Sequence, residues 1–188
     1  MTRCVTYSFV LLFCAACSNS TPLSTSNPTA PSAAGLSSAS GIENFRAHLN
    51  GDEVVLPLPI PTLAQGQAVF QLQPGGTELS YKVIASNIDN VVGAHLHLAA
   101  AGARGPLVAL LLTPPPAPAG GRTDGVLVEG TLTANMLFGP LAGQPLSALI
   151  DAIHAGNVYV DVPTNDGVAP VNSGPGDYPG GELRGQVQ

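Results

Sequence analysis

Cysteine is almost absent from this sequence. The 188 residues contain three, Cys4, Cys14 and Cys17, and none follows position 17. A disulfide framework and a metal site built on thiolates are therefore excluded for the rest of the chain. We expect the folded part to be stabilised by packing alone, and any metal ligands in it to be histidines or carboxylates.

Charged residues are also scarce. Lys and Arg number 6, Asp and Glu number 12, and the formal net charge is −6. No stretch clusters Lys or Arg, so the sequence offers no basic surface to a phosphate backbone and we expect no nucleic-acid partner. Trp is absent, whereas Gly (22) and Pro (18) are abundant, which favours an all-β domain with many turns.

The first residues, MTRCVTYSFVLLFCAACSNS, have the pattern of a secretory signal. One Arg precedes an apolar run that is too short to span a bilayer and ends in small residues. The ending FCAAC resembles the lipobox of bacterial lipoproteins, although Cys14 stands where that motif usually has Leu. The resemblance implies a signal peptide over 1–16 and acylation of Cys17. An ordinary signal peptide cleaved near Ala16 is the alternative.

The segment that follows is nearly all Ser, Thr, Pro, Ala and Asn and has no charge. Such a composition buries too little apolar surface to offset the entropy of ordering. We therefore predict a lipidated cysteine and disordered tether over 17–40 and one domain over 41–188. The acyl anchor implies a membrane partner and a location in the bacterial cell envelope. Ser18 resembles the signal for the outer membrane, and a protein that is only cleaved would lie in the periplasm.

The domain has apolar residues at every second position rather than at helical spacing. AVFQLQ and ELSYKVIASNI alternate in this way around the turn sequence QPGGTE, which predicts a hairpin. One or two strands are expected within 45–56. Further strands are predicted over Ala94–Leu98, Leu107–Leu112, Val126–Leu132, Val158–Val162 and Glu182–Val187.

A single short helix is predicted in PLSALIDAIHAGN, where apolar residues recur at helical spacing and Gly156 can end the helix. We interpret His154 in its last turn as a capping residue rather than a ligand. The expected fold is all-β: an antiparallel Greek-key or immunoglobulin-like sandwich or barrel of about eight strands with one short helix.

Two histidines stand one residue apart in GAHLHLA. On a strand, His95 and His97 point to the face opposite Leu96, so both imidazoles can reach one zinc or copper ion. A site of that kind needs a third or fourth ligand, from His48, His154 or a carboxylate. Two alternatives require no ion: a buried, hydrogen-bonded polar cluster, or an exposed pair with no role.

Four motifs in order resemble the CHRD (chordin) domain family. They are AHLNGDEVVLP, AHLHLAAAGARGPLVALLL, AIHAGNVYVDVPT and PGGELRGQV, which together span the chain from about Phe45 to Gln188. The resemblance implies a compact Greek-key or immunoglobulin-like β-domain, as found in chordin and in bacterial envelope proteins. It implies no established catalytic activity.

The resemblance also bears on the histidine pair. Where the family usually has a histidine after its Y-V-x-V strand, this chain has Pro163. Asp161, two residues earlier, could take the place of that imidazole as a ligand. Glu182 and Arg184 should share a face of the last strand. We therefore predict a buried network of His95, His97, Glu182 and Arg184, with Asp161 as the further partner if a metal binds.

Three functions fit this sequence to different degrees. The favoured one is a non-catalytic binding or scaffolding domain on the cell envelope, with an envelope protein or glycan as partner and no required cofactor. The second is a zinc- or copper-binding protein of superoxide-dismutase-like character that uses the His-x-His strand. A hydrolase is least favoured, because the chain has no G-x-S-x-G or H-E-x-x-H motif and its serines concentrate in the predicted tether.

Overall fold

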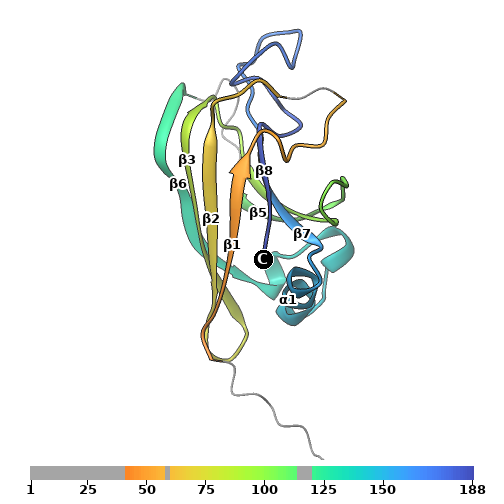
Figure 1. Ribbon diagram of the computed structural model, residues 1–188. Coiled ribbons are helices and arrows are strands. Elements are labelled where there is room, and N and C mark those ends of the chain that lie inside the picture. Colours follow the sequence, from red (N-terminus) through yellow and green to blue (C-terminus); the bar gives the residue numbers. More distant parts are fainter. Residues whose placement is uncertain (1–40, 58–59, 114–119) are drawn as a thin grey trace, which may run out of the picture. The chain divides into compact units, whose positions relative to one another are not determined.

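The computed structural model of the protein describes residues 41–57, 60–113 and 120–188 (Figure 1). The predicted signal peptide, Cys17 and the tether lie outside these residues. The strands are β1 (Glu43–Asn50), β2 (Gln65–Leu72), β3 (Glu78–Asp89), β4 (Ala94–Leu98), β5 (Leu107–Leu112), β6 (Arg122–Thr133), β7 (Val158–Val162) and β8 (Leu183–Gln186). The helical elements are the 3-10 turns η1 (Ala134–Met136) and η2 (Gly139–Leu141) and the α-helix α1 (Leu146–His154).

All eight strands belong to one antiparallel sheet with the order β5-β4-β7-β8-β1-β2-β3-β6. The sheet curves so that its two ends approach each other. The Tyr81 hydroxyl on β3 donates a hydrogen bond of 2.8 Å to the Leu111 carbonyl on β5 across the interior. The expected all-β antiparallel fold with one short helix is confirmed.

The hairpin of β2 and β3 shows how the sequence pattern produces the sheet. Leu79, Tyr81, Val83 and Ala85 are buried, and the residues between them are more exposed. A strand turns successive side chains to opposite faces, so this alternation places one apolar face inside the barrel. Gly75 and Gly76 make the connecting turn with φ values of 97° and 70°, which residues with a Cβ rarely adopt.

The helix α1 lies beside β7 at one end of the sheet (Figure 1). Its apolar face is buried, as the spacing predicted, and Gly156 follows its end with φ of 69°. The buried residues of this face are Leu146, Leu149, Ile150 and Ile153. No helix in the described part of the chain is both long enough and apolar enough to cross a bilayer.

Strand β6 is longer than the sequence pattern suggested. It begins at Arg122 rather than near Val126, because β3 continues to Asp89 and pairs with it along its length. Two register shifts, between Val83 and Ile84 and between Ala85 and Ile88, let this pairing continue. Such irregularities break the simple alternation that identifies a strand in a sequence.

Strand β8 approaches β1 so closely that one position excludes any side chain. A Cβ placed on Gly185 would lie 2.0 Å from the carbonyl oxygen of His48. The packing of β8 between β7 and β1 therefore depends on a glycine at position 185.

We expect Gly185→Ala to lower the free energy of unfolding by about 2–3 kcal/mol, because backbone must move to admit the methyl group. Urea denaturation followed by circular dichroism measures this loss. Gly174→Ala is the matched control, since a Cβ at position 174 meets no atom within 4 Å. Equal stability of the two variants would contradict the close-approach argument.

Candidate functional site

Strand β7 lies between β4 and β8, and the pairing of these three strands aligns the polar residues of the sequence motifs. His95 faces Asp161 across β4 and β7, and Asp161 faces Arg184 across β7 and β8. These three residues form one row across the strands. In the next row, His97 faces Tyr159 and Tyr159 faces Gln186.

These two rows lie on the face of the sheet opposite the core. Ala94 and Leu96 on β4 are fully buried among the core residues, so strand alternation turns His95 and His97 the other way. That face is not open surface, because every residue of β7 is buried. Val54 and Val55 help to line the small cavity that remains over it.

Asp161 lies between the two imidazoles. Its Oδ1 atom is 3.3 Å from His95 Nδ1 and 3.2 Å from His97 Nε2. The exposed fractions of the three side chains are only 18 % for His95, 17 % for His97 and 13 % for Asp161. One carboxylate oxygen thus contacts two partly buried nitrogen atoms.

The orientation of the His97 ring is fixed from its other side. His97 Nδ1 is 2.9 Å from the Gly105 carbonyl oxygen, which can only accept a hydrogen bond, so Nδ1 carries a proton. A neutral His97 therefore turns the lone pair of Nε2 toward Asp161 Oδ1. Both atoms are buried and neither has a hydrogen-bond partner among the described residues. Two facing acceptors repel each other unless a cation lies between them.

The charges of the site shift two pKa values in opposite directions. Burial disfavours the charged form of His97, but the nearby Asp161 carboxylate and the Gly105 carbonyl outweigh it and raise the pKa of His97. Burial likewise disfavours ionised Asp161, but its two histidine neighbours outweigh it and lower the pKa of that carboxyl. Asp161 is therefore held as a carboxylate that attracts a cation.

The same atoms fit a transition-metal ion. Ligand atoms of His95, His97 and Asp161 all lie within 4.8 Å of one another. In tetrahedral zinc coordination, with bonds of about 2.0–2.1 Å, neighbouring ligand atoms are about 3.3 Å apart. The two distances from Asp161 Oδ1, 3.2 and 3.3 Å, already have that value. Gly93 leaves room for the His95 ring, since a Cβ there would lie 2.6 Å from His95 Nε2.

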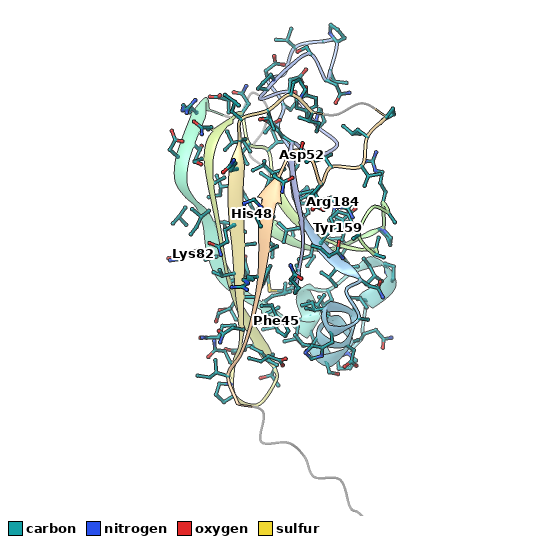
Figure 2. All side chains as sticks on the ribbon, in the orientation of Figure 1. Phe45, His48, Asp52, Lys82, Tyr159 and Arg184 are labelled. Atoms are coloured by element: carbon teal, nitrogen blue, oxygen red, sulfur yellow. The ribbon has the colours of Figure 1, made fainter. Side chains whose placement is uncertain are left out.

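Tyr159 joins the site to Arg184. Its ring is stacked on the His97 imidazole at 4.9 Å with an interplanar angle of 10°, and the Arg184 guanidinium lies 3.6 Å from its centre. Figure 2 shows Tyr159 and Arg184 together at this side of the sheet. Tyr159 was not among the site residues predicted from the sequence, although its position two residues before Asp161 on one strand would have placed it on the same face.

Glu182 belongs to a different cluster from the one proposed for it. Its carboxylate, which is fully buried, accepts hydrogen bonds from the hydroxyls of Thr62 and Thr164 and from the Gly176 backbone N–H. Arg184 instead donates to the Ala100 carbonyl at 3.3 Å. Glu182 precedes β8, where loop segments supply neutral donors, so its charge is satisfied without the histidines.

The other two histidines lie away from the cluster. His48 on β1 is exposed and is 3.3 Å from the Asn50 amide. His154 ends α1, as expected, and its Nε2 lies 2.6 Å from Glu43 Oε1. Among the described residues, His95, His97 and Asp161 are the one group with three candidate metal ligands close together.

Comparison with known proteins agrees with the sequence motifs. The model of the CHRD domain family matches residues 45–187, which include every strand of this face. No curated protein and no solved structure matches the chain.

We expect Glu182→Ala to destabilise the fold by about 3 kcal/mol or more, because three donors lose a charged acceptor. Chemical denaturation of the purified chain measures the loss. Glu182→Gln keeps one acceptor oxygen and should cost less. Glu129→Ala, at a side chain that is 64 % exposed and paired with Lys82, should cost under about 1 kcal/mol. A Glu182→Ala variant as stable as Glu129→Ala would contradict this role.

Proposed function

The chain belongs to the CHRD domain family, and from this premise we propose that it is a binding domain without catalytic activity, displayed at a bacterial cell envelope. Its partner there is an envelope protein or glycan. The first ligand that we assign to the domain is a divalent transition-metal ion, zinc or copper(II), held by His95, His97 and Asp161.

One observation carries the metal assignment: His97 Nε2 and Asp161 Oδ1 are both buried and lie 3.2 Å apart, and neither atom has a hydrogen-bond partner among the described residues. An unsatisfied buried polar atom costs about 1–3 kcal/mol, and two facing acceptors cost more. A proton or a metal ion between them removes this cost. The hydrogen bond from His97 Nδ1 to the Gly105 carbonyl would fix the orientation of the imidazole as a metal ligand.

The donor set favours a metal that accepts both imidazole and carboxylate. Two nitrogen ligands and one oxygen ligand suit zinc and copper(II), and three protein ligands leave a coordination position for a further ligand. A histidine-rich copper centre of the superoxide-dismutase kind receives less support, because His48 and His154 contact other residues. We therefore propose metal binding rather than redox catalysis.

The metal assignment predicts about one zinc ion per chain in protein purified without an affinity tag and measured by elemental analysis. His97→Ala should weaken zinc binding in isothermal titration calorimetry by at least about a hundredfold, because it removes a direct ligand. His48→Ala removes an exposed imidazole outside the cluster and should bind zinc as the original chain does. Unchanged affinity in His97→Ala, or absence of stoichiometric metal, would remove the proposal.

The envelope location rests on Cys17 and the lipobox-like sequence before it. Acyl chains contribute about 0.8 kcal/mol per buried methylene, so the multiple chains of a bacterial lipoprotein would anchor the protein firmly. A signal peptide cleaved near Ala16 without acylation would leave a periplasmic protein instead.

Acylation predicts that the protein expressed in a Gram-negative bacterium incorporates labelled palmitate and partitions into detergent. Cys17→Ser should abolish both, since serine cannot carry the thioether-linked lipid. Cys4→Ser is the matched control because it lies near the start of the predicted signal peptide. Recovery of unlabelled protein in the soluble periplasmic fraction would favour the ordinary signal peptide.

A further inference from the structure

A small cavity adjoins the proposed metal site on its Arg184 side. Its volume is about 50 Å³, and its lining includes His97, Tyr159, Asp161, Arg104 and Arg184. A single water molecule needs about 10–15 Å³ by the same measure, so the cavity admits a group of only a few atoms.

Arg184 is the most unusual residue of this cavity because it is a buried cation. Its exposed fraction is 3 %, and in the described part of the chain it forms no ion pair with a carboxylate. A guanidinium carries five N–H donors, but the only hydrogen bond it makes to a described residue is the long one from Nη2 to the Ala100 carbonyl. Burial of a charge is costly unless the charge is paired.

The stack on Tyr159 explains why Asp161 does not pair with Arg184. Asp161 faces Arg184 across β7 and β8, but the guanidinium lies over the ring of Tyr159 in the neighbouring row. Asp161 directs Oδ1 to the imidazoles instead. The cation–π contact compensates part of the charge and leaves the N–H edge without a carboxylate.

A second cation lines the same cavity. Arg104 reaches it from the exposed turn between β4 and β5. Two of the six basic residues of a chain with net charge −6 thus meet at one cavity. This local reversal of the overall charge favours an anionic ligand.

We infer that this cavity binds a carboxylate group, with the Arg184 guanidinium as its main partner. A planar carboxylate with two oxygens matches the N–H edge of one guanidinium and fits a space of this size. The inference rests on the proposed function, because an ion at Asp161 neutralises the carboxylate that would otherwise repel the ligand. The ligand is either a small free carboxylate or the C-terminal end of a peptide. Both present the same carboxylate group to Arg184.

The test is an acetate titration of the zinc-loaded full chain at constant ionic strength, followed by NMR of the arginine Nε–H signals. The Arg184 signal, identified by its absence in Arg184→Gln, should shift saturably. Arg184→Gln should weaken acetate binding, read from the Arg104 signal, by roughly tenfold or more while zinc stays bound. Arg122→Gln is the matched control, because it removes an arginine that pairs with Asp124 elsewhere.

Arg104→Gln provides a second variant in case Arg184→Gln does not fold. Arg104 is exposed, so its loss should spare the fold and weaken acetate binding roughly threefold. A short peptide with a free C terminus should shift the Arg184 signal, and its amidated form should not, if the source is a chain end. A response to acetate but not to the peptide assigns a free small carboxylate.

Three outcomes separate the two proposals. Failure of zinc to bind overturns both of them. Zinc binding with no saturable response to either acetate or the peptide overturns the carboxylate site alone. Inorganic phosphate or chloride that binds as tightly as acetate also overturns it, because the cavity would then select charge and not the carboxylate group.

Discussion

The antiparallel register of β4, β7 and β8 is the constraint from which the polar face follows. Because His95, Asp161 and Arg184 face one another across the three strands, a slip of one residue in either pairing would turn one strand's polar residues toward the core. Gly185 allows β8 to approach β1 closely enough for this arrangement. The apolar residues on the core side, Leu96 and Val160, hold the register by requiring burial.

Two buried carboxylates, Glu182 and Asp161, differ in how far their oxygens are satisfied by hydrogen bonds. Glu182 receives three neutral donors and ties the segments at Thr62, Thr164 and Gly176 to the start of β8. Asp161 Oδ1 has imidazoles on both sides and no hydrogen bond of its own within the described residues. A fully hydrogen-bonded carboxylate has a structural role, whereas one with an unsatisfied buried oxygen can bind a ligand.

Strand alternation predicted most of the strands and the shared face of His95 and His97, but not the hydrogen-bond partners of Glu182. It gave the exact bounds of β4, β5 and β7. The alternation of apolar residues with His95 and His97 on β4 also gave the shared face of the two histidines, although the β4–β5 pairing contains two register shifts that no sequence pattern marks. The partners of Glu182 were not predictable in this way. They come from turns without periodicity, and the closure of those turns depends on the whole barrel. Likewise, no local signal marks the Gly105 carbonyl as the acceptor that orients His97.

The stacked side chains of His97, Tyr159 and Arg184 connect the proposed metal site to the proposed carboxylate site. His97 reaches Tyr159 from β4, and Arg184 reaches it from β8 on the other side of β7. When His97 is protonated, two cations lie against one ring, and Arg184 opposes the raised pKa of that imidazole. The proposed metal ion would take the place of this proton and would carry more positive charge at Asp161. A carboxylate bound by Arg184, as proposed, would then lie next to an ion that attracts it, so each ligand would favour binding of the other.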